Sequence, residues 1–201
     1  MTQIIELECP GCGRPLSSDM QACPACNRPV VISSFNSVYD MPALEIHKYA
    51  NSYQKALVND PTNNHVNSAL AMCFLKLKLY DKALPAFEKA IIDNFDNSES
   101  FFWAAVCILK GKKAFLCSRA EIDKAEEYIN AAIMIEPRGV YYYFWAYLRQ
   151  DFYARKFLRI QPTYKDLIVE ARNHHVTPAE INLLFDILSV ELPDALHCIS
   201  N

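Results

Sequence analysis

Apolar residues recur at three- and four-residue spacing from Pro42 onward, which is the period of amphipathic helices. The pattern predicts helices near residues 43–59, 64–78, 82–94, 98–111, 119–135 and 140–158, and a last helix near 178–192. Residues 1–32 lack this period and are rich in Cys, Pro and Gly, and residues 33–41 form a short polar stretch. The pattern therefore predicts an all-α protein that carries a small N-terminal module.

Capping signals support the predicted helix starts. Ser118 is followed by Glu121 and Thr177 by Glu180, and each pair has the spacing of a capping box; Thr163 with Asp166 is a looser version. Pro178 lies at the first helical position, where its missing N–H costs no hydrogen bond. The last helix is apolar nearly all round, so we expect it to be buried.

Four of the 8 cysteines form two tight pairs in the segments CPGCGRP and CPACNRP. Four thiolates in two such turns make the tetrahedral set that Zn²⁺ prefers in structural sites. The residues after the second cysteines, Gly13 and Asn27, tolerate the left-handed backbone that closes each turn. We predict one structural Zn²⁺ ion, because four cysteine ligands leave no position open for catalysis. The alternative is a pair of redox-active CxxC motifs. The predicted ligands are Cys9, Cys12, Cys23 and Cys26.

Motif and spacing resemble the zinc-ribbon family over about residues 6–32. Such ribbons contact nucleic acid or protein. Residues 1–32 carry more acids than bases, and four thiolates on one divalent ion add negative charge. A module that tracks phosphates should be basic. We therefore expect a protein contact or a purely structural role.

Residues 64–97 resemble a tetratricopeptide repeat, a pair of antiparallel helices of 34 residues. The residues that carry the likeness are Leu70, Ala71, Phe74, Ala83, Phe87 and Ala90. Asn67 and Phe95 depart from it, since tryptophan and proline are usual there. The resemblance extends more weakly over about residues 43–158, although the first helix of the unit before residue 64 is missing. It implies stacked helical hairpins, an α-solenoid.

The predicted organisation is a four-cysteine zinc ribbon (1–32), a linker (33–41), tetratricopeptide-like helical repeats (42–160) and C-terminal capping helices (161–201). The linker is polar and the core of the ribbon is centred on the metal. We therefore expect the ribbon and the helical body to be separable.

In the resembling family, the first helices of successive repeats line a peptide-binding groove. The corresponding positions here imply an aromatic and apolar groove, without the Lys/Asn pattern that clamps carboxylates. Two alternatives remain: these residues are ordinary core, or the last helix covers them through residues 181–188. The implied groove residues are Met72, Phe102, Trp103, Val106, Tyr141, Phe144, Trp145 and Leu148.

Charge separates the remaining classes of function. The net charge is −3, so the whole chain is not built to attract nucleic acid. Residues 138–172 are basic and interleaved with aromatics, which suits single strands, yet residues 173–201 carry four acids and no Lys or Arg. Mutual neutralisation within the fold is the simpler interpretation.

The sequence thus predicts a cytoplasmic, non-catalytic adaptor that binds a protein or peptide. No glycine-rich phosphate loop and no catalytic motif occurs, no apolar run is long enough for a membrane span, and the first ten residues do not read as a secretory signal. The alternative is a nucleic-acid-associated factor that uses the ribbon and the basic helix at 149–159.

Overall fold

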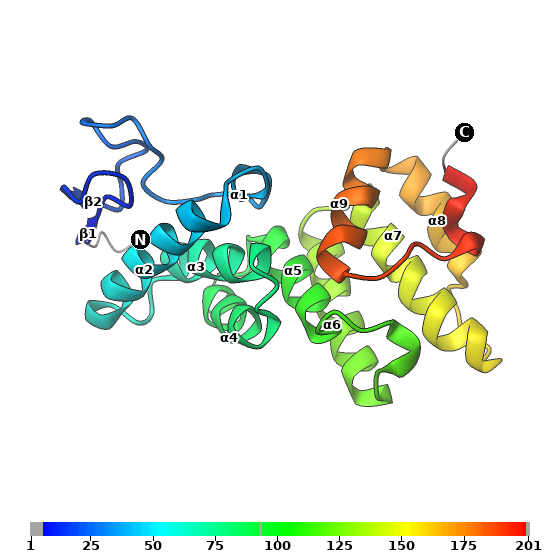
Figure 1. Ribbon diagram of the computed structural model, residues 1–201. Helices are drawn as coiled ribbons and strands as arrows, with labels where there is room; N and C mark the ends of the chain where they lie inside the picture. Colours follow the sequence, from blue (N-terminus) through cyan, green and yellow to red (C-terminus); the bar gives the residue numbers. More distant parts are fainter. Residues whose placement is uncertain (1–5, 93, 200–201) are drawn as a thin grey trace. The chain divides into compact units, whose positions relative to one another are not determined.

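The computed structural model describes residues 6–92 and 94–199 (Figure 1). The described chain forms two compact units, one up to Phe95 and one from Asp96 onward. The predicted helical body at 42–160 is thus divided between them. Residues 1–5 of the predicted ribbon, Asp93 of the predicted helix 82–94, and residues 200–201 of the C-terminal region lie outside the described residues.

The first unit begins with a small hairpin of two antiparallel strands, β1 (Glu6–Glu8) and β2 (Pro15–Ser17), in which Leu7 pairs with Leu16. A short helix, α1 (Asn36–Tyr39), follows within the stretch that the sequence indicated as a linker. Phe35 and Val38 of this stretch are completely buried. The mostly polar composition of residues 33–41 gave no sign that these two side chains are buried. The segment therefore packs against the rest of its unit through Phe35 and Val38.

Three helices complete the first unit: α2 (Ala43–Asn59), α3 (Asn64–Lys76) and α4 (Tyr80–Ile91). They pack in order, α2 on α3 and α3 on α4. Ala83 and Ala90 of α4 are fully buried with Phe87 between them, so small side chains let the helices approach while the ring fills the interior. This is the tetratricopeptide-like hairpin that the sequence predicted.

The regular secondary structure described in the second unit is all helical. It contains α5 (Ser98–Ile108), η1 (Ala114–Leu116), α6 (Arg119–Ile135), α7 (Gly139–Leu148), η2 (Arg149–Tyr153), η3 (Ala154–Lys156), α8 (Tyr164–Asn173), α9 (Pro178–Leu188) and η4 (Asp194–Ile199). Helices α5 and α6 form one hairpin, α7 packs against α8, and α9 also packs on α7. The fold is all-α, apart from the two-stranded sheet found among the described residues.

The three helix starts for which the sequence predicted a capping pair all carry reciprocal capping boxes. Ser118 with Glu121, Thr163 with Asp166, and Thr177 with Glu180 each exchange side-chain and backbone hydrogen bonds. Helix α9 buries Ile181, Leu184, Phe185, Ile187 and Leu188, as its apolar composition predicted.

The predicted helix at 140–158 does not run as one α-helix. It ends at Leu148 and continues as a π-helical turn, η2, and a 3-10 turn, η3. Phe157 then adopts a left-handed conformation with φ 57°, and the N–H of Leu158 donates to the carbonyl of Tyr153 (2.9 Å). This bond satisfies an end carbonyl in the manner of a helix C-terminus, although the left-handed residue is not glycine. Hydrophobic periodicity cannot reveal such a change of helix type.

The N-terminal hairpin packs against α2, and this contact argues against a separable ribbon. Tyr53 donates its hydroxyl hydrogen to the carbonyl of Val30 (3.1 Å) and accepts from the N–H of Ile32 (3.0 Å). One turn earlier on α2, Tyr49 donates to the carbonyl of Pro29 (3.1 Å). The helix therefore supplies hydrogen-bond partners that the chain leaving the ribbon lacks.

Polar side chains of α2 extend this contact. Ser52 donates its hydroxyl hydrogen to the carbonyl of Glu8. Lys55 forms an ion pair with the Glu8 side chain (2.7 Å), and Arg28 forms one with Glu45 (3.5 Å). Both ion pairs are partly exposed, so they contribute specificity of placement more than stability.

None of the described helices has the length and apolar character needed to cross a membrane.

Replacing Tyr53 by Phe tests the contact between the cysteine module and α2. The change removes one hydroxyl group and leaves a buried N–H and a buried carbonyl without a partner, so we expect a loss of about 1–3 kcal/mol in the free energy of unfolding. Urea unfolding followed by circular dichroism measures it. Tyr142→Phe, on a half-buried ring stacked on His174 in the second unit, is the control. Equal stability of the Tyr53→Phe variant and the wild type would contradict the assignment.

Candidate metal centre

The two CxxC segments fold as copies of one turn. In the first, the N–H of Gly13 donates to the carbonyl of Cys9 (2.9 Å), and in the second the N–H of Asn27 donates to that of Cys23 (2.8 Å). Each turn closes with a further hydrogen bond. The N–H of Cys9 donates to the backbone carbonyl of Arg14, and the N–H of Cys23 donates to that of Arg28, both at 2.8 Å. Gly13 and Asn27 have φ angles of 73° and 57°. The predicted left-handed closing residues are therefore confirmed.

The four cysteine sulfurs converge on one point. Cys9 Sγ and Cys26 Sγ are 3.4 Å apart, Cys12 Sγ and Cys23 Sγ are 3.7 Å apart, and all four sulfurs lie within 4.8 Å of one another. A disulfide needs about 2.05 Å, so all four thiols are free. A tetrahedral ion with Zn–S bonds of about 2.3 Å separates its sulfurs by about 3.8 Å. The cluster thus has the donor set and spacing to hold one metal ion.

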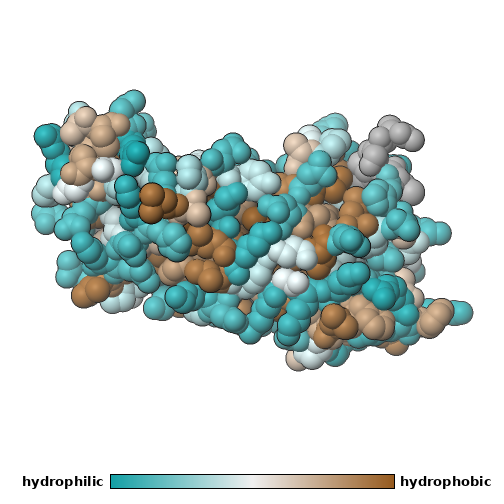
Figure 2. All heavy atoms as spheres, viewed as in Figure 1, coloured by the Kyte–Doolittle hydropathy of each residue, from teal (hydrophilic) through white to brown (hydrophobic). Residues whose placement is uncertain are grey.

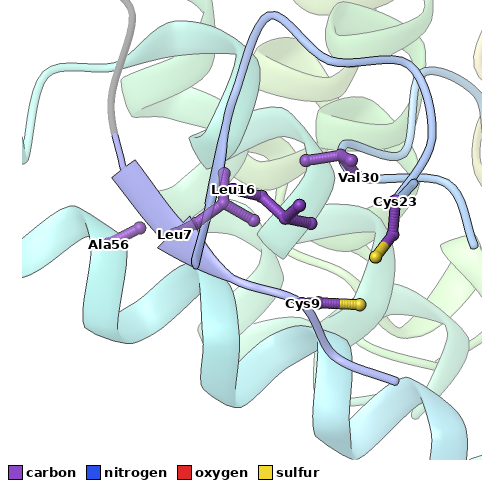
Figure 3. Packing of buried hydrophobic residues seen from close by; sticks show 6 residues of the cluster. All are labelled: Leu7, Cys9, Leu16, Cys23, Val30 and Ala56. Carbon is purple, nitrogen blue, oxygen red and sulfur yellow. The ribbon is translucent and has the colours of Figure 1, made fainter. Parts of the chain in front are cut away.

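A small apolar core lies beneath the cluster (Figure 3). Cys9 and Cys23 are buried together with Leu7 and Leu16 of the β-hairpin, Val30 and Ala56 of α2. Cys12, in contrast, is exposed. One side of the cluster therefore faces the shared core with α2, and the other side faces away from it.

The thiols have uneven proton affinities. Hydrogen bonding from the backbone N–H of Ala25, assisted by that of Cys26, lowers the pKa of Cys23 to about 6. The N–H of Arg28 also favours the Cys26 thiolate, but the neighbouring Cys9 thiol and burial prevail and raise the pKa of Cys26 to about 11. Four crowded thiols cannot all ionise unless a cation lies among them. A divalent metal ion would supply that positive charge.

One of the differences between the two turns has a steric reason. Gly11 occupies the place that Ala25 holds in the second turn. A Cβ atom at Gly11 would meet Arg28 Cδ at 2.6 Å and Cys26 Sγ at 3.1 Å. The N–H of Gly11 also points at Cys9 Sγ (3.4 Å). Glycine at this position therefore lets the second turn and its sulfur approach the first.

The implied groove residues are interior in the structure. Met72 belongs to the first unit and the other seven to the second, and all except the half-buried Trp145 are buried. Phe102 stacks on Tyr141 (ring centroids 4.6 Å apart) and meets Phe144 edge to face (5.9 Å). These contacts are those of a helix core, which was the alternative interpretation, and they argue against an open groove at these positions.

Helix α9 covers a different part of α7 from the one expected of a lid. Phe185 makes edge contacts with Tyr143 (6.3 Å) and Tyr147 (5.3 Å), and neither position belongs to the implied groove. The hydroxyl of Tyr143 also donates to the carbonyl of Leu196 (2.8 Å). The C-terminal region is therefore built into the core of its unit.

The segment 149–159 is not a free basic helix. Arg149 is buried and lies 3.0 Å from a carboxylate oxygen of Glu126, and Arg155 pairs with the buried Asp151 at 2.6 Å. Asp151 also accepts from the backbone N–H of Phe115 (2.8 Å). Sequence reasoning missed both acids as partners because one lies on another helix and the other lies within the basic segment itself. Part of the positive charge is thus neutralised inside the fold.

No protein-family model and no curated protein matches the sequence. Among solved structures, the fold is similar to a chain described as "MamA MSR-1 C2", at 18% identity and a TM-score of 0.43, over 76% of this chain and 83% of that one.

We expect one metal ion per chain. Native mass spectrometry of protein purified without added metal measures the stoichiometry, and a Cys12→Ser/Cys26→Ser variant should bind no ion. Protein that carries no metal and has the mass of an intramolecular disulfide would support the redox alternative and contradict the metal centre.

Proposed function

We propose that this protein is a non-catalytic scaffold that binds a protein partner and that carries a structural Zn²⁺ ion as part of an N-terminal cap on its helices. The observation that carries the proposal is the packing of the cysteine module on α2, the first long helix. The module is joined to the helical body by a shared apolar core and by hydrogen bonds between the Tyr53 hydroxyl and the backbone of Val30 and Ile32.

Zn²⁺ suits the ligands because four thiolates in tetrahedral spacing form its preferred structural site. Cys9, Cys12, Cys23 and Cys26 would hold it. The ion would supply a cross-link between two turns and neutralise part of their thiolate charge. A segment with so few buried apolar residues depends on metal binding for much of its folding free energy.

The cap interpretation follows from the place of α2 in the repeat pattern. Tyr53 and Ala56 match the second helix of a hairpin whose first helix is missing from the sequence. Both residues are buried, and the cysteine module contributes Leu7, Leu16 and Val30 to the cover. Repeat proteins need atypical end units that shield the last apolar face from water. Here the ribbon takes the place of the missing helix.

A groove on the first unit supports a protein partner. It has a volume of about 450 Å³ and is lined by residues of α2, α3 and α4. Leu57, Val58, Pro61 and Pro85 supply apolar surface, and Val58 is 79% exposed. On the face shown in Figure 2, hydrophobic residues gather at the surface over the α2–α4 part of the chain. Exposed apolar surface of this kind is typical of interaction sites.

Two lysines of α4 give this groove its charge. Lys82 and Lys89 are exposed and line the groove, and no acid is among its lining residues. Lys82 Nζ lies 5.9 Å from the centre of the Phe74 ring. The groove therefore suits a protein segment that presents apolar side chains flanked by carboxylates. Electrostatic complementarity of this kind raises the rate and specificity of association.

The nucleic-acid alternative has less support. The ribbon carries little positive charge, and Arg149 and Arg155 are paired with acids. Phosphate recognition needs cations that are available to displace counterions.

Affinity capture with a Lys82→Glu/Lys89→Glu variant tests the partner site. We expect at least one protein to bind the wild type and to bind the variant about tenfold or more weakly, because the reversal replaces two attractive charges by repulsive ones. The matched control is Lys48→Glu/Lys165→Glu, on exposed lysines that do not line the groove.

The captured protein is then titrated directly against the wild type, the groove variant and the control variant. An identical set of proteins on wild type and variant would contradict the assigned groove. Loss of all captured proteins after nuclease treatment would favour the nucleic-acid alternative.

A further inference from the structure

A second pocket lies in the C-terminal unit, where α7 gives way to irregular helix. It has a volume of about 510 Å³, within the range of small-molecule sites, about 300–1,000 Å³. Its walls come from η2, η3, the loop that follows them and the start of α8. The lining residues are Arg149, Tyr153, Ala154, Leu158, Arg159, Ile160, Gln161, Thr163 and Tyr164.

Charge distinguishes this pocket from its neighbour. Two arginines and no acid line it. In another pocket of the same unit, of about 310 Å³, Lys113 and Arg155 share the walls with Asp151, Glu191 and Asp194. The lining of that pocket therefore carries one more acid than bases, whereas the lining of the Arg149 pocket carries only positive charge.

Arg149 is held in place but incompletely hydrogen-bonded. Its side chain is 7% exposed, and its Nε lies 3.0 Å from Glu126 Oε1. Both Glu126 oxygens already accept hydrogen bonds, from Trp145 Nε1 and from the Tyr153 hydroxyl, each at 3.1 Å. Arg149 Nε and Nη1 make no hydrogen bond in this geometry. Buried charged donors without an acceptor are rare and indicate an additional partner.

Aromatic rings fix the position of this guanidinium. Its central carbon lies 4.8 Å from the Tyr153 ring centre and 5.3 Å from that of Trp145. Arg149 and Tyr153 are the two ends of the π-helical turn η2. Single π-helical turns inside α-helices are often found at functional sites. The turn places both residues on the wall of one pocket.

We propose that this pocket binds a monoanionic carboxylate with a compact apolar body. Arg159 and the guanidinium of Arg149 attract the carboxylate, and Leu158 and Ile160 contact the apolar part. One negative charge is favoured over two because Glu126 already balances one of the two arginines. The carboxylate belongs either to a free apolar acid or to the C-terminal residue of a peptide, and both present the same chemistry.

Isothermal titration of the full-length protein with octanoate and with N-acetyl-glycyl-leucine distinguishes the two sources. We expect saturable binding of at least one of them, and about tenfold weaker binding of its uncharged analogue, octanol or the leucine amide, because a charged hydrogen bond is lost. Inorganic phosphate should bind more weakly than the carboxylate.

Substitutions at four exposed residues locate the site without changing the buried Arg149. Arg159→Gln should weaken binding about tenfold, whereas Lys165→Gln, which removes the same charge outside the pocket, should not. Leu158→Ala should weaken binding, whereas Phe157→Ala should not, although Phe157 is its neighbour and 93% exposed. The proposal is overturned if neither carboxylate binds at millimolar concentration, or if the variants within each pair have equal effects.

Discussion

The convergence of four cysteine sulfurs is the constraint on which the N-terminal part of the first unit depends. The β-hairpin has three residues in each strand, and a hairpin of this size is not stable alone in water. The few buried apolar residues of the cysteine module, Leu7, Leu16 and Val30, reach the core only if both turns are held together. A metal ion on the sulfurs would provide that cross-link, and α2 provides the apolar surface on which the hairpin rests. Each part therefore supplies what the other lacks.

Helix α2 connects this constraint to the proposed partner site. Its buried face, with Tyr49, Tyr53 and Ala56, meets the cysteine module, whereas Gln54, Leu57 and Val58 line the lysine-flanked groove. The ion would thus stabilise one face of the helix whose other face lines the proposed partner groove. In the second unit, polar groups have a comparable role inside the core, where Glu126 holds Trp145, Arg149 and Tyr153 together.

Periodicity, caps and the duplicated cysteine motif predicted most of the helices, the three capped starts and the convergence of four thiols, because each of these depends on residues close together in the sequence. Contacts between distant residues were beyond such reasoning. The Tyr53 hydroxyl bonds to a backbone segment more than twenty residues earlier, which no local pattern signals. Likewise, the resemblance to tetratricopeptide repeats implied a groove at Phe102 and Phe144 and left a buried core as the alternative, and these rings pair with each other in the core. The π-helical turn that forms the Arg149 pocket leaves the hydrophobic spacing nearly unchanged.

Hydrogen exchange with and without bound metal tests most directly whether the cysteine module is a metal-dependent cap on the helices. Backbone amides of α2 are compared with those of α7 and α8, before chelation, after chelation and after Zn²⁺ is restored. If the cap is metal-dependent, protection in α2 falls together with that of residues 9–30, recovers with Zn²⁺, and stays unchanged in α7 and α8. If residues 9–30 lose protection while α2 keeps its own, the module is an independent appendage and the central claim is wrong.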